Sequence, residues 1–179
     1  GAQVLHNRSV EMGKRFNVDM EVISSFTRNP GTKIKEANKV EKMNVSGVAR
    51  DMDVAQISLV NMADAPGIAY KVFSTLANKG VNVDIILQST GRNNGKDIAF
   101  TVPSSSLETA KAVLEENKDS MGFDEIKVRE DLCKLSIVGA GMVNNPGVAA
   151  MMFEALAAAN VNIDMISTSE IKVSVLIPK

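Results

Sequence analysis

The chain has 179 residues, of which 45% are hydrophobic, and a formal net charge of -1 at pH 7. A chain of this length can bury a core in one or two small domains, and its well-mixed charges offer no basic face for the phosphates of a nucleic acid. No apolar stretch is long enough to span a membrane, and the N-terminal residues lack a secretory signal pattern. We therefore expect a cytoplasmic protein with no membrane and no nucleic-acid partner.

Residues 1–35 differ in kind from the rest of the chain. Their pattern predicts a short helix around Arg8–Phe16, a strand at Met20–Ser24 and a turn at Asn29–Gly31. Residues 36–43 lie in a charged and weakly patterned stretch, which is typical of a linker. We therefore expect the residues before this linker to belong to a different domain from those after it.

The sequence after the linker begins with two apolar strands. Val45–Arg50 alternates between apolar and polar residues, and Ala55–Val60 is predicted as a second strand. Pro66 stands where the first turn of a helix tolerates a missing N–H group, so a helix should begin there. Gly80 follows the apolar stripe of this helix and suits the left-handed residue that closes it. The stripe comprises Ile68, Ala69, Val72, Phe73 and Leu76.

The next segment predicts a hairpin, a second helix and a last strand. Val81–Gln88 and Asp97–Val102 are predicted strands, joined by a polar Gly/Asn turn at 91–95. Ser105–Glu108 has the spacing of a capping box, which would open a helix, and Phe123–Arg129 alternates as a strand. The order strand, helix, strand, strand, helix, strand is that of the ferredoxin-like fold, in which helices cover one face of an antiparallel sheet.

A second copy of this unit follows at a fixed distance. Asp64–Ala69 returns as Asn144–Ala149, and Val81–Asp84 returns as Val161–Asp164, each 80 residues later. A constant offset across a loop, a helix and a strand indicates one supersecondary unit built twice. Asn160 stands where the helix closes, and asparagine is the next best residue after glycine for a left-handed cap. The second copy is predicted to contain a strand at Leu135–Val138, a helix from Pro146, and strands at Val161–Ser167 and Ile171–Ile177.

The second copy ends before its last helix and strand. Because the strand at Val45–Arg50 has no partner in the first copy, it could complete the second sheet, with the first unit inserted within the second. The sequence thus predicts an α+β protein with one ferredoxin-like domain at 54–130 and another at 44–53 plus 131–179. We expect the last helix of the second domain to be missing, which favours a fragment of a longer protein or a natural short subunit.

The corner between the first strand and helix could bind a small zwitterion. Gly67, Ile68 and Ala69 bring free N–H groups to the positive end of the helix dipole, where a carboxylate would be held. Asp64 precedes these donors and Asp84 begins the neighbouring strand, so their carboxylates could meet an ammonium group. Together these groups fit a free α-amino acid. The competing interpretation is that Asp64 caps the helix and Asp84 is a solvated charge, but the repetition of the corner favours binding.

The second copy offers a related corner with a different charge. Asn144 replaces Asp64 and cannot supply a carboxylate, so the two sites need not be equivalent. Amide side chains on the neighbouring strands could form polar walls for the ligand, although such amides often satisfy local backbone groups. The candidate ligand-binding residues are Asp64, Gly67, Ile68, Ala69, Asn82, Asp84, Gln88, Asn145, Gly147, Val148 and Asn162.

No catalytic constellation is visible in the repeats. His6 is the only histidine, so a Ser/His/Asp relay would have to run through a terminal segment, and His-rich metal ligation is excluded. Cys133 is the only cysteine, which excludes an internal disulfide and a cysteine-based metal cluster. We expect no catalytic residue, no metal and no cofactor in this chain.

Three motifs carry a resemblance to a known family. They are the Pro-Gly loops at 66–67 and 146–147, the run Val81–Gln88, and the run Val161–Ile177. Together they resemble the paired ACT domains at the C-terminus of aspartate kinase (aspartokinase). Residues 1–10 and 24–32 are similar to the end of the catalytic domain in that family, so the resemblance covers essentially the whole chain.

The resemblance implies a regulatory role. The family uses ATP and Mg to phosphorylate the side-chain carboxylate of aspartate, the entry step toward lysine, threonine and methionine, and its ACT pair senses lysine and/or threonine for feedback inhibition. Members pair ACT units across a homodimer, with the effector between the first unit of one chain and the second unit of the other. The parent protein would be a kinase, whereas this chain would be regulatory and inactive. By similarity, effector contacts correspond to Asp64, Gly67, Ala69, Asp84 and Gln88.

Two other functions fit parts of the pattern. A ferredoxin-like pair that only oligomerises, with vestigial pockets, would bind neither lysine nor threonine. An RNA-binding sheet of similar topology would need exposed aromatic side chains on its central strands, and an aromatic content of 4% offers little for that.

Overall fold

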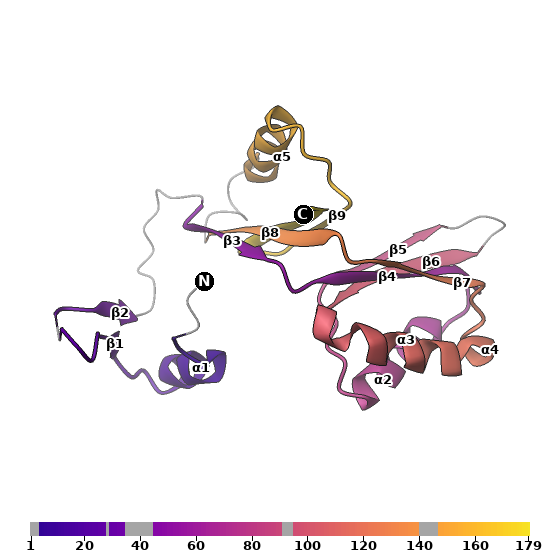
Figure 1. Ribbon diagram of the computed structural model, residues 1–179, viewed down its shortest axis with the longest axis horizontal. Helices are drawn as coiled ribbons and strands as arrows, with labels where there is room; N and C mark the ends of the chain where they lie inside the picture. Colours follow the sequence, from indigo (N-terminus) through magenta and orange to yellow (C-terminus); the bar gives the residue numbers. More distant parts are fainter. Residues whose placement is uncertain (1–3, 28, 35–44, 91–94, 140–146) are drawn as a thin grey trace. The chain divides into compact units, whose positions relative to one another are not determined.

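The computed structural model describes residues 4–27, 29–34, 45–90, 95–139 and 147–179. The chain divides into two compact units, residues 1–43 and 44–179, which are described separately (Figure 1). The predicted linker at 36–43, nearly all of the turn at 91–95 and the expected helix start at Pro146 lie outside the described residues.

The N-terminal unit is a helix followed by a small antiparallel sheet. Helix α1 (Asn7–Arg15) precedes strands β1 (Met20–Val22) and β2 (Thr32–Ile34), which confirms the predicted helix and strand. Gly13 allows α1 to approach β1 closely, because an added Cβ atom would lie 2.4 Å from the side chain of Met20.

The first repeat forms the predicted ferredoxin-like sheet. Its strands lie in the order β5-β6-β4-β7, and helices α2, α3 and α4 cover one face (Figure 1). The buried core between sheet and helices is continuous and includes Ile57, Leu76 and Phe100. The elements are β4 (Ala55–Met62), α2 (Ile68–Asn78), β5 (Ile86–Thr90), β6 (Lys96–Val102), α3 (Leu107–Glu116), α4 (Lys118–Met121) and β7 (Glu125–Arg129).

The second repeat is completed by the strand that precedes the first. Its sheet has the order β3-β8-β10-β9, so β3 takes the edge position that β7 takes in the first sheet. The first repeat is therefore inserted within the second, as predicted. The elements are β3 (Gly47–Asp51), β8 (Leu132–Val138), α5 (Val148–Ala158), β9 (Met165–Thr168) and β10 (Lys172–Pro178).

The two sheets share one continuous antiparallel ribbon. Strand β3 runs into β4 while β7 runs into β8, and these paired segments cross the middle of Figure 1 side by side. Asp51 lies opposite Lys134 in the second sheet, and Gln56 lies opposite Arg129 in the first. A buried cluster where the sheets meet consists of Val54, Ile85, Leu132, Met165 and Leu176. We call the paired segments β3–β4 and β7–β8 the central ribbon.

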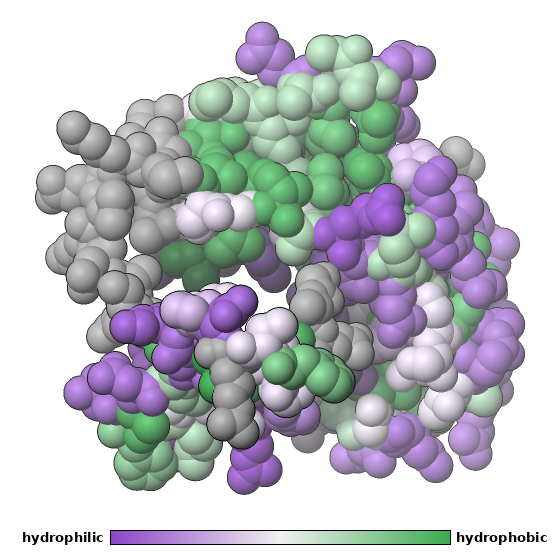
Figure 2. All heavy atoms as spheres, turned by 60° about the vertical axis from the view of Figure 1, so that its left-hand side comes forward, coloured by the Kyte–Doolittle hydropathy of each residue, from purple (hydrophilic) through white to green (hydrophobic). Residues whose placement is uncertain are grey.

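Helix α5 carries apolar residues on its outer as well as its inner side. Val148, Met152 and Leu156 face the second core, whereas the side chain of Met151 is 67% exposed. Figure 2 shows apolar side chains gathered over α5 at the top of the view. Among the described residues, α5 is the only helix on the second sheet.

The left-handed helix caps were predicted correctly. Gly80 closes α2 with a φ of 73°, and Asn160 closes α5 with a φ of 54°. In both repeats the next residue donates its N–H group to a leucine carbonyl of the helix, Val81 to Leu76 and Val161 to Leu156. Asn160 therefore adopts the same left-handed cap conformation as Gly80.

Three predicted starts were wrong. Helix α2 begins at Ile68 rather than Pro66, because Gly67 has a φ of 92°, which no helical residue adopts. Strand β5 begins at Ile86 rather than Val81, because the pairing just before it is irregular: the N–H group of Asp84 donates to the carbonyl of Thr101, whereas that of Ile85 donates to the Thr101 hydroxyl. Strand β9 likewise begins only at Met165.

The predicted capping box at Ser105–Glu108 was also wrong. A short 3-10 turn at Ser104–Ser106 precedes α3, whose cap residue Ser106 makes no side-chain cap hydrogen bond. The carboxylate of Glu108 instead pairs with Lys111, and the carboxylate of Asp53 accepts the N–H group of Ser104 at 2.9 Å.

Candidate ligand-binding site

A small cavity of about 100 Å³ lies at the predicted corner of the first repeat. It is formed by the loop after β4, the start of α2, and the facing ends of β5 and β6. The lining residues are Met62, Ala63, Asp64, Ala65, Gly67, Ile68, Ala69, Gln88, Lys96 and Ile98. The structure thus brings together five candidates from the sequence, namely Asp64, Gly67, Ile68, Ala69 and Gln88. We call this cavity the corner pocket.

The start of α2 presents backbone donors at the corner pocket. The helix has no side-chain cap, and helix geometry leaves the N–H groups of Ala69 and Tyr70 without an intrahelical acceptor. The N–H group of Ile68 is not free, contrary to expectation, since it donates to the carbonyl of Ala65 at 3.4 Å. The remaining donors and the helix dipole make this end of α2 favourable for a carboxylate.

Asp64 is not a helix cap, so the competing interpretation is wrong on this point. Its carboxylate lies 3.5 Å from the ammonium nitrogen of Lys96. Lys96 was missed by the sequence prediction, which placed the start of this strand one residue later. It is the first residue of β6 and stands two positions before Ile98, so the period of a strand puts both on the same face. That spacing could have found it.

Gln88 reaches the corner pocket from the edge strand. It lies directly opposite Ile98 in the pairing of β5 with β6, and both line the cavity. Asn82 and Asp84 do not line it. Both precede β5, where Asn82 is exposed and the carboxylate of Asp84 accepts a hydrogen bond from Lys134 at 2.5 Å. Asp84 is therefore engaged in an ion pair and is not simply a solvated charge.

Lys134 and Asp84 belong to the first of two ionic clusters on the central ribbon. Lys134 also pairs with Asp51 at 3.2 Å, and its side chain is only 18% exposed. Burial alone would lower the pKa of Lys134, but the hydrogen bonds and charges of Asp84 and Asp51 outweigh it and raise that pKa. The cluster therefore keeps Lys134 charged and joins the second repeat to the loop before β5.

The second cluster repeats this arrangement with the repeats exchanged. Arg129 of the first repeat pairs with Asp164, which occupies the position of Asp84 in the second repeat, and with Asp131 at 3.1 Å. The hydrogen bond from Arg129 lowers the pKa of Asp131, and hydrogen bonds to Asp131 and Asp164 raise that of Arg129. In each repeat, the aspartate of the loop before the edge strand is thus bound by a basic residue of the other repeat, Asp84 by Lys134 and Asp164 by Arg129.

The corner of the second repeat has the same backbone at the start of its helix. Gly147 precedes α5 with a φ of 103°, its carbonyl accepts the N–H group of Met151, and the helix has no side-chain cap. The side chain of Val148 is buried and Asn162 is exposed before β9. Asn145 lies outside the described residues.

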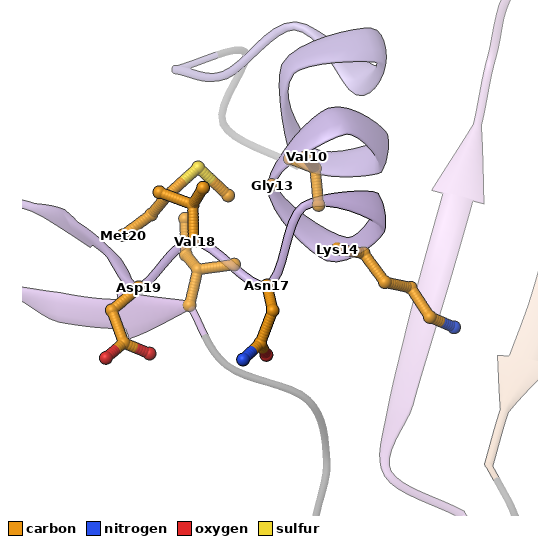
Figure 3. A pocket seen from close by; sticks show the side chains of 8 residues that line it. Val10, Gly13, Lys14, Asn17, Val18, Asp19 and Met20 are labelled. Atoms are coloured by element: carbon orange, nitrogen blue, oxygen red, sulfur yellow. The ribbon is translucent and has the colours of Figure 1, made fainter.

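The N-terminal unit contains a second cavity, which lies between α1 and β1. Figure 3 shows Val10 of the helix and Met20 of the strand at this cavity, with Asn17 and Asp19 at the connecting turn and the side chain of Lys14 extending away from Met20. Its lining is mostly apolar, with one positive charge from Lys14 and one negative charge from Asp19.

Among the described residues of the whole chain, no group of three or more His, Cys, Asp or Glu side chains is placed to hold a metal ion. No helix within the described ranges has the length and apolar character needed to cross a membrane.

Comparison with known proteins finds matches over the whole chain. A family model described as ACT domain matches residues 57–117 and 135–179. The crystal structure of the ligand-free regulatory subunit of aspartate kinase from Thermus thermophilus is 44% identical, with a TM-score of 0.71 over 76% of this chain and 89% of that chain. The crystal structure of aspartate kinase from Synechocystis is 40% identical, with a TM-score of 0.72 over 99% of this chain and 33% of that chain.

A curated relative extends beyond this sequence. The aspartokinase of Thermus thermophilus is 44% identical over 180 residues, which cover 99% of this chain and 44% of the relative. The chain therefore spans less than half the length of the curated relative it matches.

Proposed function

Because this chain belongs to the ACT-domain family, as a regulatory region of the aspartate kinase type, we propose that it binds a free amino acid, lysine and/or threonine, as a feedback signal. Binding would inhibit the ATP- and Mg-dependent phosphorylation of aspartate by the catalytic domain of the parent enzyme. The chain itself would be regulatory, without phosphoryl-transfer activity, and cytoplasmic. Residues 1–35 would be the end of that catalytic domain.

The corner pocket is the observation that carries this proposal. It places the uncapped start of α2 beside the carboxylate of Asp64 and the amide of Gln88. A free amino acid carries a carboxylate for the helix donors and an ammonium for Asp64, so its two charges match the two sides of the pocket. The equivalent corner of the second repeat, at Gly147 and Asn162, would contribute from the partner repeat.

The partner repeat would come from a second copy of the chain. Strands β5 and β9 lie at the edges of their sheets, and both expose large apolar side chains. Ile86 is 52% exposed and Ile166 is 49% exposed. Exposed apolar edge strands favour pairing with another chain, so we propose a homodimer in which the ligand is held between repeats. A ligand that fits only the paired arrangement would bias the attached catalytic domains through that difference in affinity.

Calorimetry and thermal shift with lysine and threonine test the proposal. We expect at least one of them to bind the wild-type chain, and Asp64→Ala to weaken that binding at least tenfold with little change in melting temperature. Glu116→Ala, which removes an exposed carboxylate at the end of α3, is the matched control and should bind as the wild type does.

The same exposed edges favour a second candidate, an oligomerisation module that senses nothing. Analytical ultracentrifugation distinguishes the two when combined with calorimetry. A dimer that gives no heat and no thermal shift with either amino acid would support the module and contradict the sensor.

A further inference from the structure

Lys96 gives the corner pocket a positive charge in addition to the helix donors, Asp64 and Gln88. Its ammonium nitrogen lies 3.5 Å from the carboxylate of Asp64, and its side chain is 27% exposed while that of Asp64 is 60% exposed. The cation is thus the more enclosed member of the pair. Among the described residues that line the pocket, Asp64 and Lys96 are the charged ones.

The charge balance of the pocket follows from these groups. Asp64 supplies one negative charge, whereas Lys96 and the start of α2 supply positive charge. The nearest acidic neighbour in the chain, Asp97, points elsewhere, because its carboxylate accepts the N–H group of Asn61 at 2.8 Å. A zwitterion brings one charge of each sign. Its carboxylate can bind the ammonium of Lys96 and the N–H donors of the helix, while its own ammonium binds Asp64, which then has two cationic partners.

A ligand with a cationic side chain would be bound less favourably than one with a neutral side chain. The single carboxylate of the pocket would already serve Lys96 and the α-ammonium, and a third cation would meet Lys96 and the helix start in a partly desolvated space. Like charges at such distances repel strongly. The small volume of the pocket, about 100 Å³, also favours a short side chain.

We propose that Lys96 determines the specificity of the corner pocket, by admitting amino acids with an uncharged side chain and rejecting those with a cationic one. This inference rests on the proposed function. It selects between the two effectors considered above, because threonine has a neutral side chain and lysine a cationic one.

The test is calorimetry of the full chain with threonine and with lysine, using wild type, Lys96→Met and Lys96→Arg. Methionine keeps an apolar stem of similar length without the charge, and arginine keeps the charge as the matched control. We expect wild type and Lys96→Arg to bind threonine at least about tenfold more tightly than lysine. In Lys96→Met the ratio should fall below about threefold, and in wild type it should narrow as salt is raised, because salt screens the repulsion.

The possible outcomes separate this inference from the function on which it rests. If wild type binds lysine as tightly as threonine, or if Lys96→Met leaves the ratio unchanged, the role of Lys96 is refuted and the sensor stands. If wild type binds neither amino acid, the proposed function itself fails, and the inference fails with it.

Discussion

Asp84 in the loop of the first repeat is bound by Lys134 of the second repeat, at 2.5 Å. The repeat-related Asp164 is bound in turn by Arg129 of the first repeat. Since Lys134 and Arg129 both lie on the central ribbon, each repeat fixes the loop of the other. We infer that these reciprocal ion pairs hold the two sheets in one relative orientation.

Removing Lys134 should therefore destabilise the protein. Lys134→Met keeps the apolar stem but leaves the carboxylates of Asp51 and Asp84 without their shared cation. We expect the free energy of unfolding in urea to fall by about 1 to 2 kcal/mol, between the values for exposed and buried pairs. The control is Lys111→Met, which breaks an exposed pair with Glu108 and should change it by less than about 0.5 kcal/mol. Equal losses in both variants would contradict the role of Lys134.

The contribution of Lys134 should disappear at high pH. Its pKa lies above the ordinary value of 10.5 in the folded protein, because of Asp84 and Asp51 and despite its burial. A group whose pKa is raised on folding stabilises fully below its unfolded pKa, and that stabilisation is lost as the pH rises through the folded pKa. The difference in unfolding free energy between wild type and Lys134→Met should stay constant from neutral pH to about 10 and shrink only above about 10.5. A difference that already vanishes near pH 8 would exclude this account.

Gly67 should be sensitive to substitution for a purely conformational reason. An added Cβ atom would meet nothing within 4 Å, but the φ of 92° is strained for any other residue. We expect Gly67→Ala to lower the unfolding free energy by about 1 kcal/mol. Gly47 has equally open surroundings and no positive φ, so Gly47→Ala should lie within about 0.5 kcal/mol of wild type. Chemical denaturation of both variants measures these changes. If Gly67→Ala left the unfolding free energy unchanged, the corner could adopt another backbone conformation, contrary to this account.

The two buried serines of the second sheet should behave as a pair. Ser136 and Ser174 lie opposite each other in β8 and β10, with hydroxyl oxygens 2.7 Å apart. Replacing either one by alanine leaves a buried hydroxyl without this partner and should cost about 1 to 2 kcal/mol. The double variant should cost less than the sum, with a coupling of about 1 kcal/mol in a double-mutant cycle. Strict additivity would mean that each hydroxyl finds another acceptor.

The sequence predicted features that depend on neighbouring residues or on the repeat. Gly80 and Asn160 were assigned as caps because each follows an apolar helical stripe, and β3 was assigned to the second sheet because that sheet lacked a strand. The start of α2 was wrongly placed at Pro66. Proline fixes its own φ at a helical value, but it does not indicate the left-handed φ of Gly67 that follows.

Contacts between distant segments were beyond the same reasoning. Lys96 comes to Asp64 through the pairing of β6 with β4, and this register contains an irregularity between Leu59 and Met62 that no local pattern reveals. Lys134 and Asp84 are 50 residues apart and meet only because the central ribbon joins the two sheets. The pocket was thus foreseen in its backbone and acidic group, but not in its cation.

The position of β3 sets an order of events during synthesis of the chain. The hydroxyl of Ser46, just before β3, bonds to the carbonyl of Val138, which is 92 residues later. This strand leaves the ribosome long before its partner β8 has been made, and every residue of the first repeat emerges in between. The first repeat can therefore fold while the polypeptide is still growing, whereas the second must wait until β8, β9 and β10 have been translated.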